Sequence, residues 1–295
     1  MNKKESVFIS AVLYLSDYAS NAEKFTRVLI NGLKSNFDHF EVIIVDDCST
    51  RHTTFLKEVV PSLANSFITV VHMSVKQGIE ACLRAGLDVS IGDFVFEFDT
   101  LEFIFEKDLL LDVYQEALKG NDIVSVEPKN NSLSRKLFYK IFNKYSNADY
   151  DINATAFRLV SRRAINRVLE LNISSAFRQA VYASCGLKNS RIEYKGSACL
   201  RKARNLSLAI DSFLLYTELG RKFCSFTFVM LIVDILLGLA GISVSKCEWL
   251  FNMSLLVGNA LILGELIILL YYVRLILKER NTHYLISNIE KVQRG

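Results

Sequence analysis

Two long apolar segments near the end of the chain limit what it can fold into more than any other feature. Residues 223–244 and 249–277 are each long enough to span the hydrocarbon core of a bilayer, and a short polar linker joins them. Hydrophobic residues make up 51% of the 295 residues, an apolar share typical of a chain that is partly in a membrane. The sequence therefore predicts a two-helix transmembrane hairpin, followed by a tail over residues 278–295.

Basic residues flank the two predicted spans unequally. Arg221 and Lys222 come directly before the first span, Arg274 and Lys278 close the second, and the linker carries Lys246. Because cytoplasmic loops are enriched in Lys and Arg, we expect both termini and the N-terminal domain to be cytoplasmic. The first residues, MNKKES, do not resemble a signal peptide, which agrees with this orientation.

Residues 201–222, before the first span, have apolar residues at roughly helical spacing with charges between them. This pattern is typical of an amphipathic helix that lies in the membrane interface. An ordinary packed helix is the alternative.

Two acids, Asp234 and Glu265, lie inside the predicted spans, where an unpaired charge is costly. One interpretation places them against a partner helix across an oligomer interface, which leaves a homo-oligomer open. In the other, both are protonated and hydrogen-bonded within the hairpin. The sequence does not choose between the two.

Strand-like and helix-like segments alternate along the first part of the chain. Strand-like runs fall at residues 7–14, 41–47, 67–73, 93–99 and 122–127, and helical patterns lie between them at residues 21–36, 55–65, 78–90 and 107–119. This is the rhythm of a mostly parallel sheet with crossover helices. We therefore expect one Rossmann-like α/β domain over residues 1–200.

Charge and cysteine content exclude several other classes of protein. The formal net charge of +4 is small and its basic residues are spread out, which argues against nucleic-acid binding. The six cysteines show neither CxxC pairing nor His spacing, so neither a zinc site nor a disulfide framework is indicated. A dinucleotide fold and a P-loop are also disfavoured, because GxGxxG after the first strand and GxxxxGK[ST] are both missing from the sequence.

The strand-like run EVIIVDDCST, residues 41–50, ends in the adjacent carboxylates of Asp46 and Asp47. Side chains at the carboxyl end of a buried parallel strand lie where open α/β sheets bind ligands. Asp and Ser are also common in turns and helix caps, so a purely structural role is the alternative.

Several segments, in the right order, resemble family 2 glycosyltransferases. The stretch SVKQGIEACLRAGLDVSIGDFVFEFDT, residues 74–100, is similar to the family's polar loop, its Ala- and Gly-rich helix and the strand that carries an Asp-x-Asp motif. EVIIVDDCST resembles the family's Val-Asp-Asp-Gly-Ser element. SRKLFYKIFNKYS and TAFRLVSRRAIN are similar to the segments that mark the polyprenyl-phosphate branch, the relatives of dolichol-phosphate mannose synthase and bactoprenol glucosyltransferase.

This resemblance implies a GT-A domain that moves a sugar from a UDP- or GDP-sugar to a polyprenyl phosphate. The reaction would serve a cell-envelope glycan at the cytoplasmic face of a bacterial plasma membrane. The resemblance assigns the nucleotide sugar to Asp46, Asp47, Lys76 and Gly78. Carboxylates accept hydrogen bonds from a base and a ribose, whereas a cation and a close backbone suit the diphosphate.

The same resemblance makes Asp99 the first carboxylate of Asp-x-Asp, and so the candidate catalytic residue and metal ligand. Mg²⁺ and Mn²⁺ prefer hard oxygen ligands, but the second position of the motif is Leu101, which puts the metal in doubt. Glu97 lies two residues before Asp99 on the strand and shares its face. Glu97 or Glu102 could complete a ligand set, and a paired or solvated role is the alternative for Glu97.

Arg135 and Arg158 are the candidates for binding the acceptor phosphate, because Arg recognises phosphate bidentately. Attraction to anionic lipid is the alternative for both. Relatives carry an acid before Phe157, where this chain has Ala156. A lipid phosphate is already anionic near neutral pH and needs no general base, so Ala156 favours it over a sugar hydroxyl as acceptor. A catalytically degenerate homologue that acts as a non-enzymatic subunit or scaffold is the alternative function.

Overall fold

The computed structural model describes residues 4–52, 54–63, 67–102, 107–129, 133–146, 148–170, 177–194, 206–243, 248–280 and 284–292. The chain divides into two units. The first comprises Met1–Ile141, Ala148–Arg204 and Thr282–Gly295, and the second comprises Phe142–Asn147 and Asn205–Asn281. The domain boundaries expected from the sequence stay predictions.

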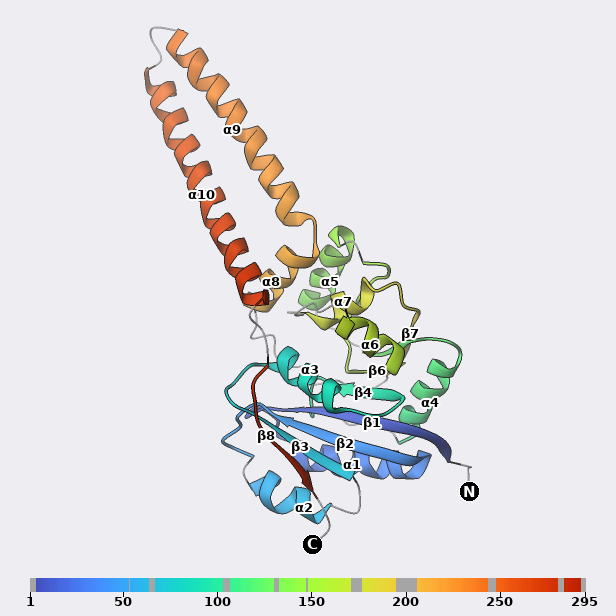
Figure 1. The fold of residues 1–295 in the computed structure, drawn as a ribbon. Helices are drawn as coiled ribbons and strands as arrows, with labels where there is room; N and C mark the ends of the chain where they lie inside the picture. Colours follow the sequence, from blue (N-terminus) through green and yellow to red (C-terminus); the bar gives the residue numbers. More distant parts are fainter. Residues whose placement is uncertain are drawn as a thin grey trace. The chain divides into compact units, whose positions relative to one another are not determined.

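One sheet forms the centre of the first unit (Figure 1). Among the described residues its strands lie in the order β7-β5-β6-β4-β1-β2-β3-β8. The strands are β1 (Glu5–Leu15), β2 (Phe37–Asp46), β3 (Phe67–Met73), β4 (Phe94–Phe98), β5 (Ile123–Pro128), β6 (Phe157–Ser161), β7 (Asn189–Tyr194) and β8 (Ile286–Val292).

The pairing of these strands is mixed but mostly parallel. β1 is parallel to β2 and β4, β2 is parallel to β3, and β5 is parallel to β7. β6 is antiparallel to both β4 and β5, and β8 is antiparallel to β3. The α/β class and the mostly parallel sheet are confirmed, and the expected strands are observed as β1 to β5.

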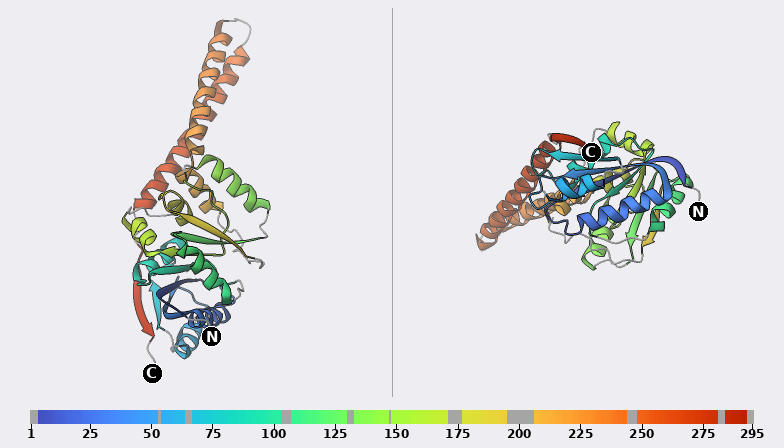
Figure 2. Two further views of the ribbon diagram at one scale, coloured as in Figure 1. Left: turned by 90° about the vertical axis from the view of Figure 1, so that its right-hand side faces the viewer. Right: turned by 90° about the horizontal axis from the view of Figure 1, so that it is seen from below.

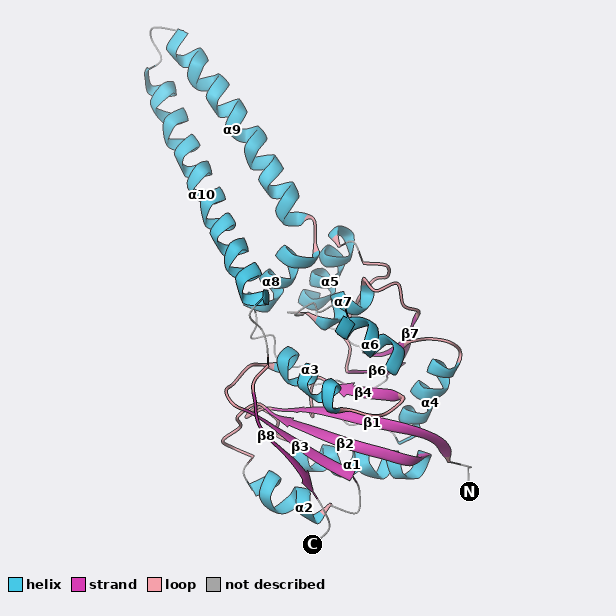
Figure 3. Cartoon of the chain, in the orientation of Figure 1, coloured by secondary structure: helices cyan, strands magenta, loops and turns pink. Residues whose placement is uncertain are grey.

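Helices connect these strands, as the two further views in Figure 2 and the colouring in Figure 3 show. The expected helices appear as α1 (Ala22–Asn36), a π-helix (Phe55–Val59) continued by α2 (Val60–Ser62), α3 (Ile79–Val89) and α4 (Lys107–Leu118). Later in the chain come α5 (Leu133–Tyr145), which passes from the first unit into the second, α6 (Arg162–Glu170) and α7 (Arg178–Ala183).

The sheet is covered on both faces, which explains the continuous apolar runs in its strands. Alternate residues of β1, such as Leu13, join one core cluster with Leu29 of α1 and Leu110 of α4. On the other face α3 lies so close that a Cβ at Gly86 would be 2.3 Å from Cγ1 of Val12. Gly86 therefore permits the close packing of α3 on the sheet.

The second unit contains α8 (Leu206–Tyr216), α9 (Leu219–Ser243) and α10 (Glu248–Arg280). Within the described residues, Phe251–Leu277 in α10 is long and apolar enough to cross a membrane, with a mean hydropathy of 2.2. This supports a membrane anchor at the second predicted span. The first span falls on α9, and residues 244–247 of the linker lie outside the described residues, so the two-span hairpin and its orientation stay predictions.

The helices of the second unit form hydrogen bonds with one another at both acidic residues of the predicted spans, through the carboxyl group at Glu265 and through the backbone at Asp234. The hydroxyl of Thr227 in α9 donates a hydrogen bond to the carboxyl of Glu265 in α10. Ser254 of α10 donates to the backbone carbonyl oxygen of Asp234 in α9 over 2.9 Å. Glu265 therefore has a hydrogen-bond partner within the helix pair, and a contact of either acid with a partner helix stays a prediction.

The residue after the two aspartates of β2 has an unfavourable backbone conformation. Cys48 has a φ of 49°, in the left-handed region, and it stands at the glycine of the Val-Asp-Asp-Gly-Ser element that this segment resembles. A Cβ in that region costs roughly 1 kcal/mol. We therefore expect Cys48→Gly to raise the melting temperature of the protein by about 2–4 °C, measured by thermal unfolding in detergent.

The control for this prediction is Cys48→Ala. Both variants lose the 2.9 Å hydrogen bond from Sγ of Cys48 to the carbonyl oxygen of Met73, and alanine alone keeps the strained Cβ, so Cys48→Ala should bring no gain. A Cys48→Gly protein that melts at or below the temperature of the parent would contradict the prediction.

Candidate active site

The carboxylate of Asp47 holds the loop that follows β3. Its Oδ1 accepts a hydrogen bond from the backbone N–H of Gln77 over 2.7 Å, and its Oδ2 accepts one from Gly78 over 3.1 Å. The hydroxyl of Tyr14, on β1, donates to Oδ2 over 3.0 Å. Asp47 therefore joins the carboxyl ends of three neighbouring parallel strands, the edge at which open α/β sheets bind ligands.

Asp46 also has partners within the chain. Its Oδ1 accepts the backbone N–H of Ser49 over 2.9 Å, and its Oδ2 lies 3.1 Å from Nδ1 of His72 on β3. Both aspartates are thus used in turns, as the structural alternative expected. A carboxylate oxygen has two lone pairs, and each oxygen of Asp46 has one of these contacts, so Asp46 can accept further hydrogen bonds from a ligand.

Lys76 meets a carboxylate that the sequence analysis did not single out. Its Nζ lies 2.6 Å from Oδ2 of Asp17, and Oδ1 of Asp17 accepts the backbone N–H of Thr50 over 2.7 Å. The hydrogen bond from Lys76, together with those from the backbone, holds the pKa of Asp17 well below its usual range. Asp17 lies two residues after the end of β1. The rule that ligands bind at the carboxyl ends of parallel strands, which singled out Asp46 and Asp47, could therefore also have identified Asp17.

Gly78 gives the loop its path into α3. Its φ of +84° lies in the region that favours glycine, and it occupies the N-cap position of α3. The backbone N–H groups of the helix start therefore point toward the loop side of the sheet edge, where an anion is stabilised.

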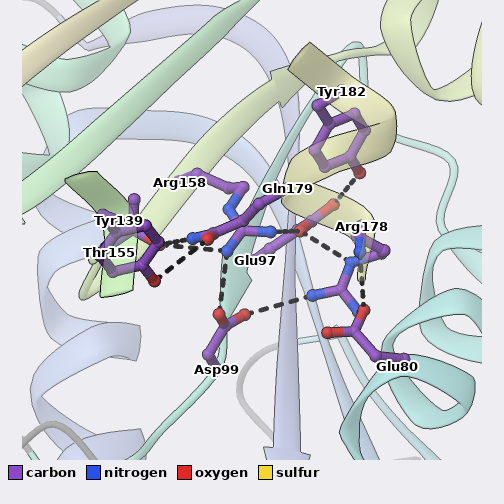
Figure 4. A network of polar contacts seen from close by, with 9 residues as sticks. All are labelled: Glu80, Glu97, Asp99, Tyr139, Thr155, Arg158, Arg178, Gln179 and Tyr182. Atoms are coloured by element: carbon purple, nitrogen blue, oxygen red, sulfur yellow. Dashed lines mark hydrogen bonds and ion pairs between the residues drawn. The ribbon is translucent and has the colours of Figure 1, made fainter. Parts of the chain in front are cut away.

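A second group of charges lies at the end of β4 (Figure 4). Glu97 and Arg158 are opposite one another on the antiparallel strands β4 and β6, and both side chains are buried. NH1 of Arg158 lies 3.2 Å from Oε2 of Glu97, and NH2 lies 2.9 Å from Oδ2 of Asp99. Burial by itself would lower the pKa of Arg158, but the two carboxylates raise it above its usual value.

Arg178, from α7, adds a second buried guanidinium that sequence reasoning missed. It lies 3.2 Å from Oδ1 of Asp99, 3.4 Å from Oε2 of Glu97 and 2.9 Å from Oε2 of Glu80 on α3. Burial opposes its charge, but the three carboxylates raise its pKa. Nothing in the local pattern marks this arginine, because α7 is short and otherwise mostly apolar.

Neutral side chains complete the network in Figure 4. The hydroxyl of Tyr182 donates to Glu97, and burial together with the charge of Glu97 raises the pKa of Tyr182 well above its usual value. Thr155 accepts from Arg158 over 3.1 Å and from Gln179 over 2.5 Å. Glu97 is therefore paired rather than solvated, as one of its expected roles stated.

Arg135 lies in the same neighbourhood. Burial raises the pKa of Tyr139 to about 12, while the positive charges of Arg158 and Arg135 both act to lower it. The hydroxyl of Tyr139 donates to Oε1 of Gln179 over 3.5 Å, which places Tyr139 beside the network. Both arginines expected at the acceptor phosphate thus act electrostatically on Tyr139, but the guanidinium of Arg158 is paired with Glu97 and Asp99. Their role in binding a phosphate stays a prediction. Arg201 and its neighbours lie outside the described residues.

The residues around Asp99 do not by themselves form a metal site. Each oxygen of the Asp99 carboxylate already accepts a guanidinium, and Leu101 is 1% exposed in the apolar core. Glu102 accepts from the hydroxyl of Ser20 over 3.5 Å and does not join the network. Within the described part of the chain, no group of three His, Cys, Asp or Glu side chains could hold a metal ion. A cation held by protein oxygens alone would need several more ligands than Asp99 supplies, and a cation shared with the phosphates of a bound nucleotide sugar stays a prediction.

The chain is similar in sequence to several curated glycosyltransferases. The chain is 26% identical over 163 residues to the prophage bactoprenol glucosyl transferase homolog of Escherichia coli (strain K12), which covers 52% of each protein. It is 23% identical over 298 residues to CsbB of Bacillus subtilis (strain 168), which covers 88% of this chain and 87% of CsbB. The chain spans between 52% and 64% of the length of three curated relatives that it matches.

A solved structure supports the fold. The mannosyltransferase PcManGT from Pyrobaculum calidifontis, in complex with GDP-Man and Mn²⁺, superposes with a TM-score of 0.52 at 14% identity, over 95% of this chain and 77% of its own. The model of glycosyl transferase family 2 matches residues 19–171, slightly more than half of the chain. The match includes the ends of β2, β3 and β4, where the carboxylates and Lys76 gather, and the chain belongs to glycosyl transferase family 2.

Proposed function

We propose that this chain transfers a sugar from a UDP- or GDP-sugar to a polyprenyl phosphate at the cytoplasmic face of a membrane. The observation that carries the proposal is the gathering of Asp17, Asp46, Asp47 and Lys76 at the carboxyl ends of three parallel strands, within or beside the segment that matches the family. The relationship to bactoprenol glucosyl transferases and the apolar Phe251–Leu277 segment support a lipid acceptor.

On the donor side, Asp46 and Asp47 would accept hydrogen bonds from the base and the ribose. Lys76 has a side chain that is 61% exposed, so its ammonium can turn from Asp17 toward a diphosphate. Gly78 and the start of α3 would bring backbone N–H groups close to the same phosphates. A ligand hydrogen bond to Asp47 would replace the longest of its internal contacts, the 3.3 Å one from the backbone N–H of Gly78 to Oδ1.

On the acceptor side, the lipid phosphate oxygen would attack the anomeric carbon of the sugar. A new carbon–oxygen bond forms as the bond to the nucleoside diphosphate breaks, and the electron pair of that bond leaves with the diphosphate. The phosphate is already anionic near neutral pH, so the buried Ala156 is no obstacle. Arg135 would bind the acceptor phosphate, with Arg158 positioned by Glu97 and Asp99. The proposal assigns no step to a divalent cation.

A non-catalytic subunit or scaffold is the second candidate function. It is favoured by one observation, the position of Leu101 in the apolar core, because this removes the second carboxylate of the family's motif. The two candidates differ in what happens when Asp99 is neutralised.

The first test concerns the nucleotide. Asp47→Ala should weaken UDP or GDP binding by roughly 1–3 kcal/mol, because a buried acceptor is removed from the base and ribose and from the loop at Gly78. Calorimetry on the purified full chain measures this. The matched control is Asp38→Ala, an exposed aspartate near the opposite end of β2, which should bind like the parent. If the parent, Asp47→Ala and Asp38→Ala bind the nucleotide equally well, the role of Asp47 is structural only.

The second test concerns the reaction. The purified chain, given a radiolabelled UDP- or GDP-sugar and a polyprenyl phosphate, should produce a labelled lipid that partitions into organic solvent. Asp99→Asn should lower this rate by about 100-fold or more, as expected when a charge at the reacting centre is lost. Glu102→Gln, outside the network, should keep the rate. A parent that labels no lipid with any donor, and an Asp99→Asn variant that still supports the cellular role, would favour the scaffold.

A further inference from the structure

The segment that follows α10 returns to the loop that carries the candidate donor residues. Residues 281–283 separate the end of α10 from Tyr284, and the next residue, Leu285, makes three hydrogen bonds with this loop. Its carbonyl oxygen accepts the backbone N–H of Ser74 over 2.8 Å and Nε2 of Gln77 over 2.9 Å. Its backbone N–H donates to Oε1 of Gln77 over 3.0 Å. The amide of Gln77 therefore pairs with both polar groups of one backbone unit.

The contact continues along β8. This strand pairs antiparallel with β3, from Met73 opposite Ile286 to Ile68 opposite Val292. The hydroxyl of Ser287 donates to the carbonyl oxygen of His72 over 3.0 Å. Nδ1 of His72 in turn lies 3.1 Å from Oδ2 of Asp46, a residue expected to bind the nucleotide. The C-terminal strand β8 therefore contacts the partner of Asp46.

Gln77 is the point at which these contacts meet. Its backbone N–H donates to Asp47, and its side chain binds Leu285. A loop without regular structure loses conformational entropy on binding a ligand, unless other contacts already hold it in place. Three hydrogen bonds to Leu285 on one side and two to Asp47 on the other supply such contacts.

We propose that residues 284–287 form part of the donor site and that Gln77 is a positioning residue, which holds the loop with Lys76 and Gly78 in its binding geometry. This inference rests on the proposed function, since it concerns the same nucleotide sugar. It adds a segment far outside residues 19–171, the part of the chain that matches the family. It also makes donor affinity depend on the chain segment directly after the apolar helix α10.

The test compares Gln77→Ala with the parent as full chains in detergent. Hydrogen exchange at the backbone N–H groups of Gln77 and Gly78 should become faster. UDP or GDP binding, measured by calorimetry, should weaken by about tenfold, the loss expected from about two net hydrogen bonds. In the lipid-transfer assay KM for the donor should rise while kcat stays near the parental value, because the chemistry at Asp99 is untouched.

Two further variants keep the test sharp. Tyr284→Phe removes the hydrogen bond from the tyrosine hydroxyl to Asp88 on α3. It should also speed hydrogen exchange at Gln77 and Gly78 and weaken UDP or GDP binding, but by less than Gln77→Ala does. Asn288→Ala is the matched control on β8, because the side chain of Asn288 bonds to Glu290 of the same strand and should leave both readouts unchanged.

Each outcome decides the proposal. Faster exchange with weaker donor binding supports it. Faster exchange with parental donor affinity would make the contact structural only and overturn it, as would unchanged exchange in Gln77→Ala. A parent that binds neither UDP nor GDP contradicts the proposed function and, with it, the role of Gln77 in donor binding. The exchange data would then still show whether Leu285 holds the loop.

Discussion

The buried carboxylate of Glu97 is the constraint on which the rest of the candidate active site depends. A fully buried charge left unpaired costs several kcal/mol, so the chain must bring positive charge to it. Arg158 comes from the adjacent strand and Arg178 from α7, while the hydroxyl of Tyr182 supplies a neutral donor. The same two guanidiniums reach Asp99, two residues further along the strand. The arginines that neutralise Glu97 therefore also hold the carboxylate of Asp99, the candidate catalytic residue, in place.

This network connects the two halves of the candidate site. Arg178 pairs with Glu80 in the first turn of α3, the helix whose N-cap is Gly78. Burial raises the pKa of Glu80, while Arg178 opposes that change. The loop with Lys76 and Gly78 is thus held by Asp47 and Leu285. The helix that follows this loop, α3, is held by the ion pair between Glu80 and Arg178. In our proposal the nucleotide and acceptor sites share this support.

The sequence predicted the parts of the structure that have a strong local signal. Strands β1 to β5 are apolar runs, and the carboxyl ends of β2 and β4 place Asp46, Asp47 and Asp99 at the same edge of the sheet. Strands β7 and β8, NSRIEY and ISNIEKV, have no buried residue and are rich in polar side chains, so they carry little strand signal, and their pairing appears in the fold alone. The pairing of Glu97 with Arg158 depends on the register of β4 and β6. The contacts of Arg178 and of Leu285 join residues far apart in sequence, which no local pattern encodes.

In our account the carboxylate of Asp99 pairs with arginines rather than with a metal ion. The most direct test of this central claim is Mn²⁺ binding by the purified full chain, measured by electron paramagnetic resonance with and without UDP or GDP. One guanidinium contacts each oxygen of Asp99, and Leu101 offers no ligand. We therefore expect the parent and Asp99→Asn to bind Mn²⁺ equally weakly, and added nucleotide to create no difference between them. A tight, stoichiometric Mn²⁺ site in the parent that disappears in Asp99→Asn would contradict the central claim.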